Sequence, residues 1–180
     1  MRFNVCLAAL AATLVASPAF AQQAPTASDT ASALAKGVVL QAHHIKKVTD
    51  LDFGVVTVDP AKDGTVTISA DSSGTRTTGG NGGVTPLPST FQAAEFDGLA
   101  APDETVQLTL TPPASNVLVS TTNVNDKITV TSLDLDAAGP SRKTDASGQF
   151  TVWVGGTFTL GAGQNAGVYT GQFDLKADYQ

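Results

Sequence analysis

Apolar and polar residues alternate along the last stretch of the chain, and this pattern constrains the fold more than any other feature. Between Tyr169 and Tyr179 one set of alternate positions is apolar apart from a glycine, and the other set is polar. A period of two is typical of a β-strand with one buried and one solvated face. We therefore predict that the chain ends on a strand of a sheet, available to a partner. The apolar set is Tyr169, Phe173, Leu175, Ala177 and Tyr179.

Similar alternation recurs in short segments elsewhere. In residues 105–111, Val106, Leu108 and Leu110 are predicted to face the core, and the polar residues between them to face solvent. Glycine, proline and asparagine turns separate the segments, and no window of a dozen residues has the pattern of an amphipathic helix. The sequence therefore predicts an all-β fold, an antiparallel β-sandwich of eight to ten strands with Greek-key connections.

The order of strands and loops can also be predicted. The segments 55–58 and 65–70 flank a turn that contains Pro60 and an Asp-Gly pair, so we expect them to form a hairpin. Residues 72–89 contain several glycines and are predicted to be a long loop. Further strands are expected near 91–96, 117–120, 127–135, 149–154 and 157–160.

The N-terminus has the features of a secretory signal peptide. Arg2 precedes an apolar stretch, and Ala19-Phe20-Ala21 is a small-x-small cleavage site. The apolar stretch is too short to span a membrane, and no later segment approaches twenty apolar residues, so we predict no membrane span. We expect export to the periplasm or the cell surface. The predicted parts are a signal peptide (1–21), a flexible N-terminal extension (22–36) and a single β-sandwich domain (37–180).

Composition narrows the classes of partner and chemistry. The formal net charge is −6, which argues against a nucleic-acid partner and against anionic lipid, because both require clustered lysine and arginine. The only cysteine, Cys6, lies in the predicted leader, so the exported domain is expected to lack a disulfide and a thiolate metal site. Adjacent strand residues such as His43 and His44 point to opposite faces and cannot share a metal ion. No serine lies in a nucleophile elbow, and we predict no enzymatic activity, cofactor or metal.

Several motifs carry a resemblance to a known family. They are Leu51-Asp52-Phe53-Gly54, Gly64-Thr65-Val66-Thr67-Ile68, Gly155-Gly156-Thr157 and Ala166-Gly167-Val168-Tyr169-Thr170-Gly171. With these motifs the chain resembles the bacterial secreted family known as domain of unknown function 4402. The first and last motifs are also similar to those of spore-coat-U and pilin-like domains of chaperone–usher systems. This resemblance implies an immunoglobulin-like, pilin-like fold with one strand missing.

In that class of protein a chaperone strand fills the open groove first, and the extension of the next subunit then replaces it. The resemblance therefore implies a surface fibre involved in adhesion, with a periplasmic chaperone, an usher and other subunits of the same kind as partners. Residues 22–42 could supply the donor strand, or Val38, Leu40 and Ala42 could form the first domain strand. The residues implied in strand complementation and assembly are Gly167, Tyr169, Phe173, Leu175, Ala177 and Tyr179.

An alternative function is a periplasmic or cell-surface module that binds a ligand such as a glycan. Trp153 lies between Val152 and Val154, so its side chain is expected on the face opposite theirs. An indole on a solvated face can stack on a sugar, and one that is covered packs into the core. In the first case Trp153, together with the glycine-rich segment 79–83, would hold the ligand.

Overall fold

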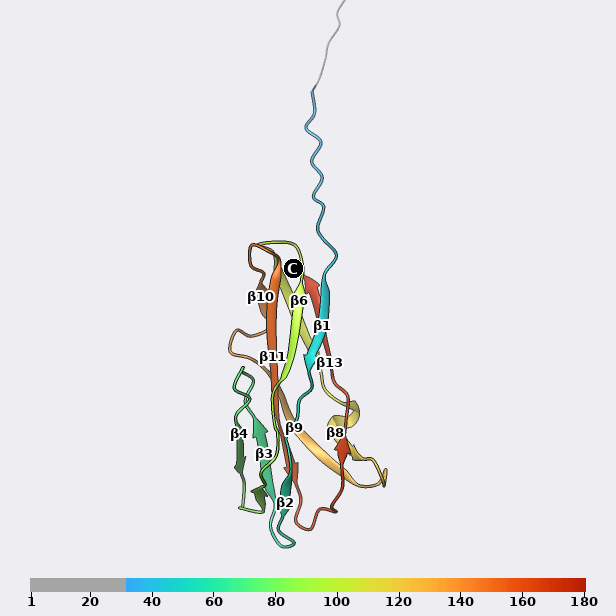
Figure 1. The fold of residues 1–180 in the computed structure, drawn as a ribbon. Coiled ribbons are helices and arrows are strands. Elements are labelled where there is room, and N and C mark those ends of the chain that lie inside the picture. Colours follow the sequence, from blue (N-terminus) through green and yellow to red (C-terminus); the bar gives the residue numbers. More distant parts are fainter. Residues whose placement is uncertain (1–31) are drawn as a thin grey trace, which may run out of the picture. The chain divides into compact units, whose positions relative to one another are not determined.

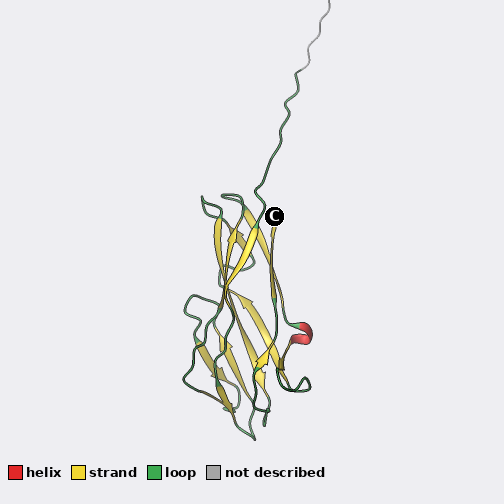
Figure 2. Cartoon of the chain, turned by 45° about the vertical axis from the view of Figure 1, so that its right-hand side comes forward, coloured by secondary structure: helices red, strands yellow, loops and turns green. Residues whose placement is uncertain are grey.

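The structure is a computed structural model that describes residues 32–180. The predicted signal peptide (1–21) and residues 22–31 of the predicted extension lie outside the described residues. Residues 38–180 form one compact unit. It contains thirteen β-strands and one short 3₁₀-helix, η1 (Ala114–Asn116), drawn in red in Figure 2. All the strand pairs recorded in it are antiparallel, which confirms the all-β antiparallel prediction.

The largest sheet has eight strands and supplies one layer of the sandwich (Figure 1). Six strands lie in a continuous order, and two more, β3 and β4, extend from the side of the central strand β11. The six are β1 (His44–Thr49), β6 (Ala94–Leu99), β11 (Gln149–Leu160), β9 (Lys127–Leu135), β8 (Val117–Ser120) and β12 (Tyr169–Thr170), and the other two are β3 (Gly64–Ile68) and β4 (Arg76–Gly79).

Strand β11 is the longest of the described strands, and three other strands of the large sheet pair with it. Its first half pairs with β6 and its second half with β3, while β9 runs along its other edge. The sequence predicted two strands here, and the structure has one. Gly155 and Gly156 do not interrupt it: a Cβ atom on Gly155 would lie 2.4 Å from the carbonyl oxygen of Ile68, so glycine permits a close backbone approach at this point.

Two smaller sheets cover the inner face of the large one. One contains β10 (Ser141–Lys143), β7 (Thr105–Thr111) and β13 (Asp174–Tyr179), and the other contains β2 (Val56–Val58) and β5 (Val84–Pro86). Each smaller sheet contributes to a separate hydrophobic cluster. The first cluster contains Phe96, Val106, Leu108, Val152 and Ala177, and the second contains Val66, Val84, Ile128, Phe158 and Leu160.

The predicted hairpin of residues 55–58 and 65–70 is wrong. Strand β2 pairs with β5, and β3 pairs with β4 and β11. Val56 and Val58 pack against the cluster that contains Val66, so the two strands contribute to the same core from different sheets. The predicted loop at 72–89 is also wrong in part, because it contains β4 and β5.

The terminal segment is interrupted, contrary to the single strand predicted from Tyr169 to Tyr179. Strand β12 pairs with β8 in the large sheet, and β13 pairs with β7 in a smaller one. The chain changes sheets near Gly171, where a Cβ atom would lie 2.8 Å from the Leu118 side chain. The alternation itself is confirmed, since Ala177 is buried and the other apolar residues pack against a core cluster: Tyr169, Phe173, Leu175 and Tyr179.

Residues 32–43, the described part of the chain ahead of β1, have no regular secondary structure. Residues 32–37, which form part of a separate unit, are exposed, and so are residues 38–43 of the domain. Val38 is 71 % exposed and Val39 is 96 % exposed. Val38, Leu40 and Ala42 are therefore not the first strand of the domain, because residues 38–43 have no strand structure and β1 begins at His44.

Candidate functional site: an open apolar groove

A groove of about 730 Å³ lies between an early segment of the domain and a late one. The first wall is residues 50–56 together with Val58, and the second wall is residues 164–171 together with Phe173. The two walls thus come from segments near the start and near the end of the domain's sequence, and both border the second hydrophobic cluster.

The floor of the groove is apolar and belongs to the large sheet. Its residues lie on β8, β9 and β11, and they are Leu118, Ile128, Val130, Leu133, Phe158 and Leu160. The ring of Phe53 on the first wall packs edge-on against Phe158, with centroids 4.5 Å apart. Ile128, Val130, Phe158 and Leu160 are buried, whereas Leu118 and Leu133 are half-buried, so the groove reaches the second hydrophobic cluster and its floor is partly covered.

The strands beside the groove keep one edge without a strand partner. Within residues 32–180, β2 pairs only with β5, and β12 pairs only with β8. Each strand has a second row of backbone N–H and C=O groups that no other described strand occupies, and such an edge is a template for pairing with an added strand.

Apolar side chains are also exposed on the two rims. Val55 on the first wall is 53 % exposed, and Val168 on the second wall is 65 % exposed. When a strand enters the groove, exposed apolar area on both rims is removed from water at the same time.

At its other end the domain is closed by the C-terminal strand. The hydroxyl of Tyr179 accepts a hydrogen bond from the N–H of Ala101 at 2.8 Å and donates one to the carbonyl oxygen of Gln41. The ring of His43 lies edge-on to the Tyr179 ring, with centroids 5.5 Å apart. Strand β1 therefore begins beside the end of β13, and the chain then runs through β1 to the first wall of the groove.

The structure divides the six residues expected in strand complementation. Gly167, Tyr169 and Phe173 line the groove. Leu175, Ala177 and Tyr179 lie on β13 in the first cluster, which Phe173 also contacts, and they do not line the groove. The break between β12 and β13 separates these two groups, and the alternating pattern alone gave no sign of it.

The first wall was not predicted from the sequence as part of the site. Its residues include the Leu51-Asp52-Phe53-Gly54 motif, which was noted as a family feature without a structural role. The available signal was the glycine after an aromatic residue, because glycine often marks a special backbone conformation and Gly54 has a φ of +72°.

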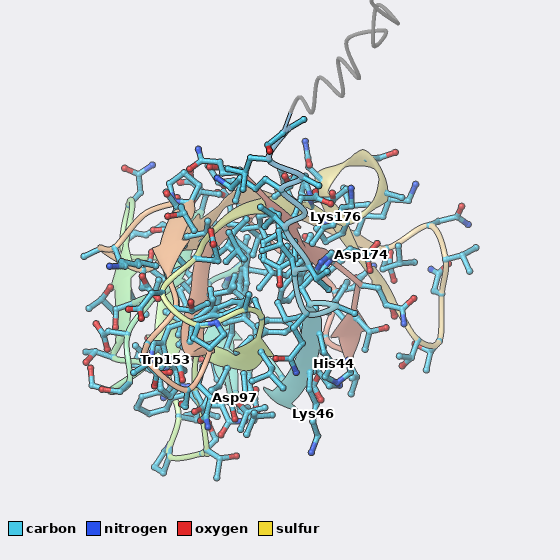
Figure 3. All side chains as sticks on the ribbon, turned by 90° about the horizontal axis from the view of Figure 1, so that it is seen from above. His44, Lys46, Asp97, Trp153, Asp174 and Lys176 are labelled. Atoms are coloured by element: carbon cyan, nitrogen blue, oxygen red, sulfur yellow. The ribbon has the colours of Figure 1, made fainter. Side chains whose placement is uncertain are left out.

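Trp153 lies on the outer face of the large sheet. Val152 and Val154 are fully buried and Trp153 is half-buried, which confirms that the indole is on the opposite face. Its cross-strand partner is Glu95, and the neighbouring pair is Thr151 and Asp97, whose side chains form a 3.1 Å hydrogen bond. In Figure 3, Trp153, Asp97 and Lys46 follow one another along one side of the domain, while Asp174 and Lys176 lie on another.

The glycine-rich segment 79–83 is not close to Trp153. Gly79 pairs with Thr65, and Thr65 pairs with Thr159 on β11. Thr159 is six positions from Trp153 along that strand, which corresponds to about 20 Å at the usual rise per residue. The structure therefore does not bring together the two features that a shared glycan site would require.

Two carboxylates have a pKa below the ordinary value, and neither lines the groove. Hydrogen bonds from Ser73 and Ser69 lower the pKa of Asp71, and hydrogen bonds from the side chain of Ser147 and the backbone of Gln149 lower that of Asp145. Both side chains accept bonds within their own turns, which is the usual role of aspartate at such positions. No group of three metal-ligating side chains gathers among residues 32–180.

No helix in the described part of the chain is long and apolar enough to cross a membrane. Comparison with curated proteins and with solved structures gave no match. A family model described as "Domain of unknown function (DUF4402)" matches residues 44–179, that is, from the first residue of β1 to the last residue of β13. The match covers both walls and the floor of the groove. The chain therefore belongs to the DUF4402 family.

Proposed function

We propose that this chain is a secreted structural protein, a pilin-like subunit or minor fimbrial component with a role in adhesion, which joins other chains by accepting a β-strand into the groove. The observation that carries this proposal is the combination of an apolar floor with two bordering strands, β2 and β12, each paired on one side only among the strands of residues 32–180. An added strand would satisfy backbone groups and bury apolar area in one step, which is the mode of recognition called β-augmentation.

The donor in this proposal is an extended segment of another protein chain. Residues 32–43 of a second copy suit the groove, because they are exposed, have no regular secondary structure and carry Val38, Val39 and Leu40. They precede β1, whose first residues lie beside the end of β13, whereas the groove lies beyond the end of β1. A copy that donates this segment and accepts another in its groove uses two different surfaces, so the association is head-to-tail, and it extends as a fibre where the rotation between copies does not close a ring.

A periplasmic chaperone and an usher are the further partners of this proposal. A chaperone strand in the same groove would cover the exposed apolar rims before assembly, and the donor segment would then replace it. The proposed location is the periplasm for the free chain and the cell surface for the assembled fibre.

The test uses the full chain, expressed with its own N-terminus and recovered from the periplasm. We expect multimers on a denaturing gel when the sample is not boiled, and only the monomer after boiling. Val168→Arg places a charge on the rim of the groove and should abolish the multimers. Val124→Arg is the matched control, because Val124 is 72 % exposed and does not line the groove. A chain that is monomeric at every concentration, or equal multimers in both variants, would contradict the proposal.

A second candidate is glycan binding on the outer face of the large sheet. It is supported by the half-buried indole of Trp153 beside the carboxylates of Glu95 and Asp97, since sugar-binding surfaces combine an aromatic face with hydrogen-bonding groups. Binding on a glycan array that Trp153→Ala removes and Trp153→Phe retains would favour this function, and an array with no bound glycan would eliminate it.

A further inference from the structure

The guanidinium group of Arg76 connects three segments of the domain. Arg76 is the first residue of β4. Its Nη1 donates to the carbonyl oxygens of Phe53 at 3.1 Å and Val55 at 3.3 Å. Its Nη2 donates to the carbonyl oxygen of Leu87 at 2.8 Å, and Nη1 also contacts the Ser89 hydroxyl at 3.3 Å. The same group therefore holds the segment before β2 and the segment after β5.

The charge of Arg76 is stabilised without a carboxylate. The ion pairs recorded within residues 32–180 involve other cations. The guanidinium carbon instead lies 4.6 Å from the centroid of the Phe91 ring, a cation–π contact. Several acceptors spread around a planar fork suit arginine, whereas the lysine ammonium is a point charge that cannot reach them all.

The backbone of Val55 is held from the same side. Its N–H donates to the Ser89 hydroxyl at 2.8 Å, and its carbonyl oxygen accepts from the N–H of Leu87 at 2.9 Å in addition to the bond from Arg76. Both polar backbone groups of Val55 therefore point to the body of the domain, and its apolar side chain is left on the rim of the groove.

Glycine at position 54 is what lets the guanidinium approach. A Cβ atom there would lie 2.4 Å from Nη1 of Arg76 and 2.6 Å from the Ser89 hydroxyl, and the backbone φ of +72° disfavours other residues. The glycine of the Leu51–Gly54 motif and the arginine of β4 thus form one arrangement, which we call the Arg76 clamp: Arg76, Gly54, Ser89 and the carbonyl groups of residues 53, 55 and 87.

Arg76 itself does not line the groove, but most of the residues that it holds form part of the groove wall. Phe53, Gly54, Val55 and Ser89 line the groove, whereas Arg76 does not. We infer that Arg76 is a positioning residue: it fixes the first wall so that an incoming strand meets a preformed edge, and strand affinity depends on it. This inference rests on the proposed function for its second half, the affinity, and on the contacts alone for its first half, the position of the wall.

The experiment compares Arg76→Lys with Arg142→Lys in the full chain. Arg142 is also a guanidinium that holds a loop, since it donates to Asp136 and to the carbonyl oxygen of Gly139, and none of these residues lines the groove. Two quantities are measured on the monomer fraction of each variant. One is hydrogen–deuterium exchange in residues 51–58 and 86–91, and the other is the affinity for a synthetic peptide of residues 32–43.

We expect Arg76→Lys to accelerate exchange in these two segments, and to weaken peptide binding about tenfold, as for loss of one charge-assisted hydrogen bond. Arg142→Lys should leave both unchanged while it lowers the melting temperature. Gly54→Ala should reproduce the effect of Arg76→Lys, and Ser89→Ala replaces these variants if they do not fold.

The outcomes separate the two proposals. Equal exchange in Arg76→Lys and Arg142→Lys would overturn the role of Arg76. Faster exchange combined with unchanged peptide affinity would support the position of the wall and overturn the dependence of strand affinity on Arg76. If the unmodified chain does not bind the peptide, the proposed function fails for this donor, and the exchange of the wall alone then supports or overturns the positioning role.

Discussion

Phe53 and Phe158 meet nearly edge-on at an interplanar angle of 61°, and this contact joins the first wall of the groove to its floor. Edge-to-face aromatic pairs contribute about 0.5–1.5 kcal/mol beyond the area that they bury. We predict that Phe53→Leu and Phe158→Leu each lower the free energy of unfolding, and that the two changes are coupled by about 1 kcal/mol in a double-mutant cycle measured by urea denaturation. Strictly additive losses would show that the rings do not interact.

The Tyr179 hydroxyl gives a second prediction. Ala101 is 8 % exposed, and its N–H donates to that hydroxyl. Tyr179→Phe removes the acceptor and leaves a buried donor unpaired, so the free energy of unfolding should fall by about 1–3 kcal/mol. Tyr169→Phe is the control, because its hydroxyl donates to the carbonyl oxygen of Asn165 and accepts from the side-chain amide of Gln164, and neither partner is a buried backbone N–H. Equal effects of the two changes on the urea midpoint would refute the prediction.

Gly98 is predicted to be sensitive to any added side chain. It pairs with Phe150 across β6 and β11, and a Cβ atom would lie 2.0 Å from the edge of that ring. Gly98→Ala should therefore displace Phe150 from its place in the first cluster and cost about 1–3 kcal/mol, the usual range for overpacking. Gly161→Ala, which adds a methyl group with no atom within 4 Å, should change stability by less than about 0.5 kcal/mol. Thermal unfolding of Gly98→Ala and Gly161→Ala measures both changes in stability, and equal changes would contradict the prediction.

The buried ion pair of Arg142 and Asp136 gives a fourth prediction. The two side chains are 7 % and 14 % exposed, and Asp136 also accepts from the N–H of Trp153 at 2.9 Å. Asp136→Ala leaves the guanidinium buried without its partner and should lower the free energy of unfolding by about 3–5 kcal/mol. Adding Arg142→Met should recover part of that loss, because the unpaired charge is then gone. If the double variant is as unstable as the sum of the single ones, the pair is not a coupled unit.

Strand character was predictable because it depends on alternation within a few residues. The pattern at 105–111 gave β7 with its bounds, and Val106 and Leu108 are buried as predicted. Pairing was less predictable, since β2 and β3 have apolar faces that fit either a hairpin or two facing sheets, and only the long-range pairing of β2 with β5 and of β3 with β4 and β11 distinguishes these arrangements. The same applies to Gly155 and Gly156, which read as a break in the sequence and are instead a point of close approach within β11.

Of the two walls of the groove, only the second could be predicted from the sequence. Alternation near the C-terminus identified Tyr169 and Phe173 on the second wall. The first wall depends on Arg76, which is distant in sequence and has no carboxylate that would suggest a partner, so nothing local indicated its contacts with Phe53 and Val55. Long-range hydrogen bonds from one side chain to several carbonyl groups leave no periodic signal.

The length of β11 has a consequence for how the domain comes apart. One end of this strand contributes Phe150 and Val152 to the first cluster, and the other end contributes Phe158 and Leu160 to the second. If either end of β11 separates from its neighbouring strands, the backbone hydrogen bonds that hold the other end are weakened as well. We therefore expect the two halves to unfold as a single cooperative unit. Calorimetry should record one transition with equal calorimetric and van't Hoff enthalpies.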